Sequence, residues 1–517
     1  MSSQTYNAIT DLLDRNIDEG RGDKVAFIDR KRQVTYKQLQ AESCRVAHLL
    51  KKLGIRQEQR VALIMLDTVD YPAVFLGAMR AGIVPVLLNT LLPAEQYAYV
   101  LKDCRARALF VSPQLLSIVE PILPRLSDLE HVIVAGDAPG GTSFKRLQES
   151  LDSLPQQFDA AETHPDEPAF WLYSSGSTGM PKGVKHVHTS LMETAKLYGQ
   201  GVLGMREDDV VFSAAKLFFA YGLGNSLTFP MSVGATAVLL DERPTPGKIF
   251  EVMHRDQPTM FFGAATGYAG MLVDPACAPE KGSQRLRLCI SAGEALPEHV
   301  GLKWKERYGV DILDGIGSTE MLHIYVSNAP GDVKYGTTGR AVPGYEVRLV
   351  DEDGGDVRDG EIGEMVLRGP SAAEGYWNQR EKSRNTFQGQ WMRTGDKFMR
   401  DSEGRYTYCG RSDDMFKVSG IWVSPFEVEN ALVSHPSVLE AAVIPAADGD
   451  GLLKPKAFIV LKGAEATSAL DDDLKEHVKR SIGPWKYPRW IEVVDELPKT
   501  ATGKIQRFKL REISNVA

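Results

Sequence analysis

Residues 171–188, WLYSSGSTGMPKGVKHVH, bring small polar side chains, glycines and one lysine together between an apolar run and a helix-like segment. Gly176, Gly179 and Gly183 allow backbone conformations with positive φ, so successive N–H groups can point at one anion. Lys182 adds a positive charge. Further donors come from the hydroxyl groups of Ser174, Ser175, Ser177 and Thr178. The stretch favours a polyphosphate ligand over an ordinary polar loop, although it is not a Walker loop because Gly183 follows the lysine.

Alternating strands and helices must position this loop. Val61–Leu66 is a continuous apolar run, as expected for a strand buried on both faces. The helix predicted before it has Thr35 as its N-cap and Gly54 as its stop, and the helix after it closes at Gly82. Further strands are predicted at 83–88, Ala108–Val111, Val132–Val134 and Leu288–Ile290. Strands separated by helices predict parallel sheets with crossover helices.

The pattern of apolar and turn-forming residues changes beyond about residue 345. Residues 344–369, GYEVRLVDEDGGDVRDGEIGEMVLRG, alternate short apolar runs with Gly/Asp turns and predict antiparallel pairing. A charged, turn-rich segment follows, and then about 105 residues with strand candidates at 441–445 and 456–461. We therefore predict two domains, 1–412 and 413–517.

Composition narrows the class of protein. The 517 residues are 43% hydrophobic and 25% charged, and the net charge of −8 without a long basic run argues against a nucleic-acid surface. The N-terminus lacks a basic region followed by an apolar core, and no window approaches 18 uninterrupted apolar residues. Five scattered cysteines show no metal-binding spacing. We expect a cytoplasmic protein with no membrane or nucleic-acid partner.

Five motifs in fixed order make the chain resemble the acyl-adenylate-forming superfamily of acyl-CoA synthetases, adenylation domains and firefly luciferase. They are YSSGSTGMPKGV, DGIGSTE (314–320), RTGD (393–396), GRSDDMFKVSG (410–420) and LPKTATGKIQR (497–507). Two further details, KLFFAYGLGNS (216–226) and STEMLHI (318–324), resemble benzoate-CoA ligases and their hydroxy- and aminobenzoate relatives.

The resemblance implies a fold and a reaction. The fold class is α/β, with a large N-terminal domain of mixed αβ subdomains, a small β-barrel-like part, and a small mobile α+β C-terminal domain. The reaction joins a small aromatic carboxylic acid to ATP, giving an aryl-adenylate and pyrophosphate, and coenzyme A then displaces AMP. The implied cofactors are ATP, Mg²⁺ and coenzyme A, and the protein is expected to be a monomer or a homodimer.

The resemblance also assigns roles to nucleotide-binding residues, where cations and oriented donors must stabilise charge at the α-phosphorus. The loop holds the β- and γ-phosphates, Thr319 bonds the α-phosphate, and Glu320 holds Mg²⁺, which prefers few protein ligands plus phosphates and water. Asp396 accepts both ribose hydroxyls and Arg411 contacts ribose or phosphate. The other nucleotide-site positions implied are Gly293, Glu294, Asp314, Gly315 and Ile316. Family members often stack an aromatic ring on adenine where this chain has Ile316, so apolar packing is expected instead.

Two catalytic states are implied by the C-terminal motifs. Lys504, on the tip TGK, bridges the acyl carboxylate and the α-phosphate during adenylation, a transient contact suited to a long-stemmed ammonium. Asp413 is the hinge about which the small domain rotates. The rotation brings Gly420 to a pantetheine tunnel, where a glycine permits close backbone approach.

The acyl pocket is implied to contain a ring wall in the FFAYG segment. Its residues are Phe219, Ala220, Tyr221, Gly222, Gly317 and His323, with Gly293 and Ile316 alongside. A ring substituent would need a polar partner because an unpaired buried group costs about 1–3 kcal/mol, and His323 or Tyr221 could serve. The sequence is thus interpreted as that of an ATP-dependent aryl-CoA ligase. The alternatives are a stand-alone adenylation domain that loads a carrier protein, a luciferase-type oxygenase, and a non-catalytic nucleotide-binding module.

Overall fold

The computed structural model describes residues 5–136, 144–174, 180–412, 414–418, 421–449, 452–463, 467–484, 486–499 and 505–514. The chain forms two compact units. The first unit comprises Met1–Glu346 and Leu367–Met392, and the second comprises Val347–Val366 and Arg393–Ala517. The two units are defined by how densely their residues contact one another. The predicted boundary at 412/413 instead separates two domains that are expected to move, and it stays a prediction.

An eight-stranded sheet in the first unit carries the end of the phosphate-loop segment. Its strands lie in the order β19 (Gly375–Tyr376), β9 (Lys182–Val187), β8 (Pro168–Ser174), β4 (Val84–Leu87), β3 (Arg60–Ile64), β5 (Ala108–Val111), β6 (His131–Val134) and β7 (Lys145–Arg146). The strands from β8 to β7 run parallel, whereas β19, β9 and β8 pair antiparallel. The strands predicted between residues 61 and 134 are confirmed.

A nine-stranded sheet forms the other half of the first unit. Its order is β16 (Arg340–Ala341), β15 (Ile324–Ser327), β14 (Ile312–Gly317), β13 (Leu288–Ala292), β12 (Met260–Gly263), β10 (Val210–Ser213), β11 (Thr236–Val238), β1 (Val25–Ile28) and β2 (Gln33–Thr35). Strands β14 to β1 are parallel, as the alternation of strands and helices predicts, and β15, β16 and β2 add antiparallel edges.

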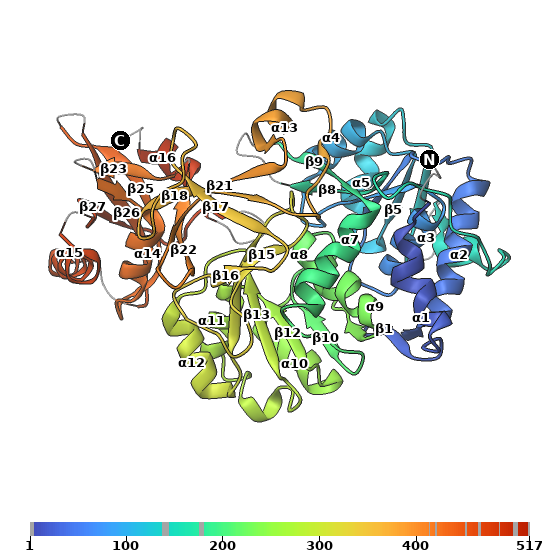
Figure 1. Cartoon of the computed structure of the whole chain (residues 1–517), viewed down its shortest axis with the longest axis horizontal. Coiled ribbons are helices and arrows are strands. Elements are labelled where there is room, and N and C mark those ends of the chain that lie inside the picture. Colours follow the sequence, from blue (N-terminus) through green and yellow to red (C-terminus); the bar gives the residue numbers. More distant parts are fainter. Residues whose placement is uncertain are drawn as a thin grey trace. The chain divides into compact units, whose positions relative to one another are not determined.

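The helices of the first unit cover and separate these sheets. Figure 1 shows α7, α8 and α9 between the two sheets, and α10 to α12 on the outer face of the nine-stranded sheet. Among the described helices none is both long enough and apolar enough to cross a membrane. The α-helices are α1 (Arg15–Asp18), α2 (Tyr36–Lys52), α3 (Asp70–Arg80), α4 (Ala94–Cys104), α5 (Leu116–Val119), α6 (Leu147–Leu151), α7 (His188–Thr194), α8 (Ala220–Leu223), α9 (Phe229–Val233), α10 (Pro246–Asp256), α11 (Ala265–Val273), α12 (Glu298–Tyr308) and α13 (Arg380–Thr386). Short 3₁₀ or π-helical turns span Thr10–Asp14, Pro113–Leu115, Glu120–Arg125, Ala195–Gln200, Gly224–Thr228 and Pro279–Lys281.

Helix α2 shows how local sequence sets these elements. The Thr35 side chain accepts a hydrogen bond from the Gln38 backbone N–H, and the Gln38 side chain accepts one from the Thr35 backbone, forming a capping box. Gly54, with φ of +76°, follows the end of the helix, and Gly82, with φ of +70°, follows the end of α3. The predicted cap and both predicted stops are confirmed.

The second unit supplies most of a five-stranded sheet. This sheet corresponds to the part that was expected to be β-barrel-like. Its strands are β17 (Glu346–Val350), β18 (Ile362–Arg368), β21 (Trp391–Arg400), β20 (Phe387–Gln388) and β22 (Tyr406–Arg411). A separate sheet contains β25 (Val438–Ala447), β26 (Leu453–Leu461) and β27 (Trp490–Val493), and β23 (Phe416–Val418) pairs with β24 (Ile421–Val423). The two strands predicted at 441–445 and 456–461 are confirmed as β25 and β26, which pair antiparallel.

Three helices complete the second unit: α14 (Pro425–Val433), α15 (Ser468–Ile482) and α16 (Arg507–Ser514). An ionic network joins α14 and α16 to Asp414. Arg507 bonds both oxygens of Glu429 and lies 3.4 Å from Asp414, which also takes a 3.1 Å hydrogen bond from Arg511. The same Glu429 carboxylate accepts the Val443 N–H of β25 at 2.7 Å. The network ties the last described helix to the residue that follows the predicted hinge.

Candidate functional site

A buried polar triangle lies where the phosphate-loop segment meets the 318–320 segment. The Lys182 ammonium donates to Glu320 Oε1 at 2.8 Å and to the Tyr376 hydroxyl at 2.7 Å, and that hydroxyl donates to the same Oε1 at 2.8 Å. Lys182 Nζ also lies 4.0 Å from the centre of the Tyr376 ring. Burial raises the pKa of the Glu320 carboxyl, but the nearby ammonium and the two hydrogen bonds outweigh it, and the net direction is downward. The carboxylate is therefore ionised at neutral pH.

Backbone bonds hold the three members of this triangle. Strand β19 pairs antiparallel with β9, so Tyr376 faces Val184, two residues beyond Lys182. The Ala373 N–H donates to the Glu320 carbonyl at 2.8 Å, which fixes the same segment to Glu320. The Ser383 hydroxyl of α13 accepts the Tyr376 N–H at 2.9 Å. Residues distant in sequence are thus fixed at one place.

Thr319 is positioned by a buried histidine. His186 Nε2 donates to the Thr319 carbonyl at 2.8 Å, and the imidazole stacks on Phe170 with 5.2 Å between ring centroids. Burial lowers the pKa of His186 to about 4, so the ring is neutral at pH 7. A neutral imidazole with Nε2 protonated orients the backbone next to Glu320 without adding charge.

Several predicted residues lie outside the described residues. They are Ser175, Gly176, Ser177, Thr178, Gly179, Asp413, Gly420 and Lys504. At the described ends of the loop, Ser174 closes β8 opposite Lys182 of β9. The prediction of positive φ at Gly183 is wrong, because this residue lies within β9 in extended backbone. A Cβ at Gly183 would lie 3.1 Å from the Tyr173 ring, so close packing explains the glycine.

The FFAYG segment, the predicted ring wall, contacts the parallel strands β12 and β13. The Tyr221 hydroxyl donates to the carbonyls of Gly263 and Ile290, at 3.3 and 3.2 Å. Phe219 precedes α8 and contacts Phe218, with ring centroids 4.5 Å apart. Ala220 and Gly222 are buried in α8. The Tyr221 hydroxyl is therefore engaged by the main chain.

His323 packs against this wall. Its Nε2 donates to Asn225 Oδ1 at 3.1 Å and lies 3.3 Å from the Tyr221 carbonyl oxygen, and its ring centroid is 5.5 Å from that of Tyr221. Burial lowers its pKa to about 3. Among the described residues, no group hydrogen-bonds its buried Nδ1. The structure thus brings Tyr221 and His323 together, with the histidine neutral.

A buried aspartate supports the start of the same segment. Asp67, which follows β3, accepts the Leu217 N–H with both carboxylate oxygens, at 3.3 and 3.2 Å. Burial raises its pKa to about 6, although the Lys216 charge and the bond from Leu217 oppose the shift. Asp67 therefore links the eight-stranded sheet to the predicted ring wall.

The remaining predicted positions of the first unit lie at the ends of β13 and β14. Gly293 follows β13 with φ of +95°, and Glu294 accepts the Thr266 N–H at the start of α11 at 2.7 Å. Asp314 is buried, accepts the Leu296 N–H at 3.3 Å and has its pKa raised by burial. Within β14, Gly315 is buried, Ile316 is half-buried and Gly317 is exposed. A Cβ at Gly317 would lie 2.5 Å from the His323 carbonyl oxygen.

Asp396 and Arg411 belong to the second unit. They face each other across β21 and β22, and Arg411 donates to Asp396 Oδ1 at 3.2 Å. Gly395 precedes the aspartate with φ of +71°. The two residues predicted to contact ribose are thus a pair on adjacent strands.

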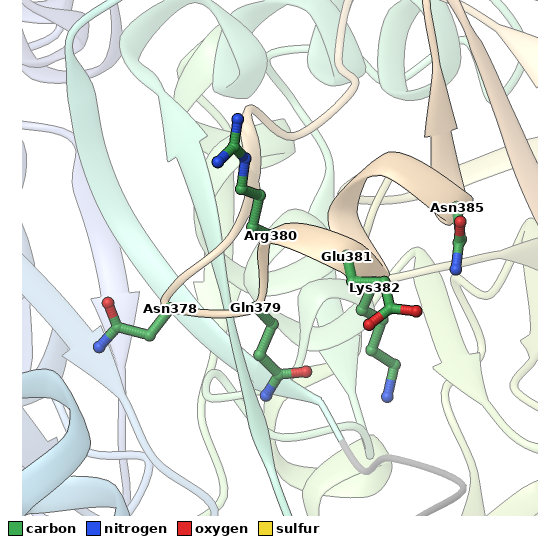
Figure 2. A pocket seen from close by; sticks show the side chains of 6 residues that line it. All are labelled: Asn378, Gln379, Arg380, Glu381, Lys382 and Asn385. Atoms are coloured by element: carbon green, nitrogen blue, oxygen red, sulfur yellow. The ribbon is translucent and has the colours of Figure 1, made fainter.

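A polar cavity of about 440 Å³ lies at the start of α13 (Figure 2). Its lining residues are Asn378, Gln379, Arg380, Glu381, Lys382 and Asn385. Burial and the Lys182 charge lower the pKa of Lys382, and Glu320 opposes them. One lining residue of the cavity, Lys382, is therefore close enough to Lys182 and Glu320 to feel their charges.

Sequence reasoning did not find Tyr376, His186 or Asp67. Tyr376 is 194 positions from Lys182 and 56 from Glu320 in the chain, so no local spacing connects them. The sequence signal available was the stretch EGYW (374–377), whose two central residues form the short strand β19. A lone buried histidine or aspartate carries no pattern of its own.

Comparison with known proteins places this geometry in a family. The profile of the AMP-binding enzyme family matches residues 13–377, and that of the AMP-binding enzyme C-terminal domain matches residues 427–504. The chain is 55% identical to a 4-hydroxybenzoate–CoA/benzoate–CoA ligase of Rhodopseudomonas palustris, covering 99% of this chain and 95% of that protein. It is 56% identical to a benzoate–CoA ligase of Thauera aromatica, covering 98% and 96%.

A solved structure shares the same architecture. The anthranilate CoA ligase AuaEII, crystallised with anthranoyl-AMP, superposes with a TM-score of 0.94 at 45% identity, covering 99% of this chain and 98% of that one. The predicted superfamily and α/β fold class are confirmed by these matches over almost the whole chain. This chain belongs to the AMP-binding enzyme family.

Proposed function

We propose that this protein is an AMP-forming aryl-acid–CoA ligase that activates benzoate and closely related ring acids such as 4-hydroxybenzoate. The observation that carries the proposal is the 55–56% identity, over nearly the full length, to two ligases that both act on benzoate by name. The predicted enzyme class, an acid–thiol ligase, agrees with both relatives. The glycine-flanked ring wall at Tyr221 supports a flat acyl group.

In the first half-reaction, a carboxylate oxygen of the acid attacks the α-phosphorus of ATP. The bond from that phosphorus to the bridging oxygen breaks, and pyrophosphate leaves. The charge that develops there calls for cations and oriented donors. Lys182 supplies a buried ammonium beside the loop, and Thr319 lies next to Glu320 on a backbone held by His186. Lys504 bridges the acyl carboxylate and the α-phosphate.

The chemistry of Glu320 fits a magnesium site. Its carboxylate is largely buried and ionised, and the side-chain hydrogen bonds from Lys182 and Tyr376 both fall on Oε1. Mg²⁺ binds through one or two carboxylates plus phosphates and water, and it supplies charge neutralisation of the phosphate chain when bound. Glu320 would hold the ion, and Lys182 would then contact phosphate oxygens.

In the second half-reaction, the coenzyme A thiol attacks the acyl carbonyl, AMP leaves with the bonding pair, and the thiol proton passes to solvent. Domain rotation about Asp413 removes Lys504 and brings Gly420 to the pantetheine. Asp396 and Arg411 hold the ribose and phosphate of the nucleotide. The protein acts as a monomer or a homodimer.

The test is a pyrophosphate-release assay with benzoate, 4-hydroxybenzoate, 2-aminobenzoate and cyclohexanecarboxylate, each with and without coenzyme A. We expect ATP- and ring-acid-dependent release, with steady turnover and aryl-CoA formation only when coenzyme A is present. A single burst that coenzyme A does not convert into turnover would favour carrier-protein loading. No release with any ring acid would overturn the proposal.

A further inference from the structure

The Tyr376 hydroxyl occupies a position that the reaction described above does not explain. It accepts one hydrogen bond from Lys182 and donates one to Glu320, at 2.7 and 2.8 Å. Only 5% of Tyr376 is exposed, and Lys182 and Glu320 have side-chain exposures of 12% and 14%. A hydroxyl that both donates and accepts suits a place between a cation and an anion.

Tyr376 is held more firmly than the two charges that it contacts. Its backbone N–H donates to Ser383, the next residue's N–H donates to the Gly183 carbonyl at 2.8 Å, and the ladder of β19 with β9 fixes its register. Its ring also packs against Phe387, with centroids 5.6 Å apart. Lys182 and Glu320 have flexible stems, so the tyrosine is the fixed member of the triangle.

The triangle as it stands cannot persist during the reaction. Lys182 neutralises Glu320, yet the proposed function needs Glu320 for a divalent cation and Lys182 for phosphate. A metal ion at the carboxylate and an ammonium 2.8 Å from the same oxygen would repel each other. The ammonium must leave Oε1 when the ion arrives, and among the described residues the side-chain donor that stays on Oε1 is then the Tyr376 hydroxyl.

We propose that Tyr376 is a positioning residue that keeps the Glu320 carboxylate aimed at the metal ion and holds Lys182 nearby while the ammonium moves from Glu320 to the phosphate chain. The hydroxyl bond to Oε1 orients the carboxylate so that Oε2 meets the ion. The ring face, 4.0 Å from Nζ, keeps attracting the ammonium after it leaves the carboxylate. This inference rests on the proposed function because it deepens the role of Glu320.

The test uses Tyr376→Phe in the full-length protein, a change that keeps the ring and removes the hydroxyl. Binding of Mn²⁺ is followed by electron paramagnetic resonance in the presence of a non-reacting ATP analogue. Loss of a hydrogen bond that orients a metal ligand typically lowers metal affinity about 10–100-fold, so we expect half-saturation at about tenfold higher Mn²⁺. The KM for benzoate should stay within about twofold of the wild-type value, because the ring wall is untouched.

The matched control is Tyr97→Phe. Tyr97 is also fully buried in the first unit, and its hydroxyl donates to the Asn89 carbonyl at 2.8 Å. This variant should bind Mn²⁺ as the wild type does. An unchanged Mn²⁺ half-saturation in Tyr376→Phe, or an equal shift in Tyr97→Phe, would overturn the inference.

A second set of variants separates the two parts of the proposal, which are the orientation of the Glu320 carboxylate and the holding of Lys182 near it. Lys182→Met removes the competing ammonium, and adding Tyr376→Phe to it should still weaken Mn²⁺ binding by about the same factor. If the tyrosine change has no effect in that background, Tyr376 acts only through Lys182 and the aiming role is wrong. Pyrophosphate release by the wild type is measured alongside, so failure of the proposed function is detected separately from failure of this inference.

Discussion

At the scale of single residues, two separable roles are proposed for Tyr221. Its hydroxyl bonds the Gly263 and Ile290 carbonyls, whereas its ring is proposed to line the acyl pocket. Tyr221→Phe removes one donor from the Gly263 carbonyl, whereas the Ile290 carbonyl keeps the Tyr268 hydroxyl at 2.9 Å, so we expect the free energy of unfolding to fall by about 1 kcal/mol. Relative kcat/KM across the acid panel should hardly change. Denaturant unfolding and the panel assay together check this.

Tyr221→Ala removes the ring as well. We expect KM for benzoate to rise and bulkier acids to be accepted, because truncation opens space beside the glycines. Equal relative kcat/KM values for the wild type and Tyr221→Ala would place Tyr221 outside the pocket. The Phe variant serves as the control for stability.

Candidate site residues could be picked out from the sequence only where a motif contained them. Lys182 and Glu320 stand in recognisable segments, and the structure brings them to 2.8 Å. Tyr376 and Asp67 complete contacts made between distant parts of the chain, and a tyrosine or an aspartate in an apolar context has no spacing to mark it. The positive φ predicted for Gly183 was wrong because glycine also serves close packing, which sequence does not distinguish from turn geometry.

At the scale of elements, Asp67 connects the end of β3 to the segment before α8. Its carboxyl has a pKa of 3.8 in the open chain and about 6 when folded. Between these values the folded protein keeps a proton that the unfolded chain has lost. The resulting contribution to stability is full below pH 4 and falls as pH rises through about 6, by about 1.4 kcal/mol per pH unit.

The Asp67→Asn variant has no titratable group at this position. Its unfolding free energy can therefore be compared with that of the wild type as the pH changes. We expect the unfolding free energy of this variant, relative to the wild type, to rise by about 2 kcal/mol between pH 4 and pH 6 and to level off above pH 7, about 3 kcal/mol above its low-pH value. Denaturant unfolding of both proteins at four pH values measures it. Parallel pH profiles would show that burial does not shift this carboxyl.

Helix α8 depends on a glycine. A Cβ at Gly222 would lie 2.0 Å from the Lys216 carbonyl oxygen, so Gly222→Ala must displace the FFAYG segment. We expect it to lower the free energy of unfolding by about 3 kcal/mol. Gly267 in α11 has open space around its Cβ position, so Gly267→Ala should be neutral or stabilising by up to about 1 kcal/mol. Equal unfolding midpoints for the two variants would contradict this account.

Much of the arrangement of elements could be predicted from short apolar runs and their helical spacers. The strands from β3 to β6 and the N-cap of α2 at Thr35 followed from local pattern alone. The parallel pairing of β1 with β11, about 210 residues apart, did not, because partner choice depends on tertiary packing. The π-helical turn Gly224–Thr228 after α8 likewise had no local signal.

At the scale of the whole molecule, the proposed function assigns the two half-reactions to different arrangements of the same chain. Lys504 should matter only in the first. Loss of a preorganised charge contact typically costs about 10²–10³ in rate, so Lys504→Ala should slow adenylation at least that much. Supplied with benzoyl-AMP and coenzyme A, the same variant should form benzoyl-CoA at close to the wild-type rate.

Single-turnover measurements of both steps on one folded preparation check this prediction. Retention of the thioester step identifies Lys504 with adenylation alone. A comparable loss in both steps would mean that Lys504 serves both, and the proposed rotation about Asp413 would be wrong.

The ionic network of the second unit limits how the C-terminal part can be exchanged between relatives. Asp414 accepts hydrogen bonds from Arg507 and Arg511, and Arg507 also donates to Glu429. The beginning and the end of the C-terminal part therefore belong to one network of ion pairs. A chimera joined just after Asp414 would pair a host carboxylate with donor arginines that were selected beside another residue. A junction placed before Arg411 transplants the carboxylate together with its arginines, but it also replaces the Arg411 that faces Asp396. Grafts in this region should therefore begin between Arg411 and Asp414, a window of two residues.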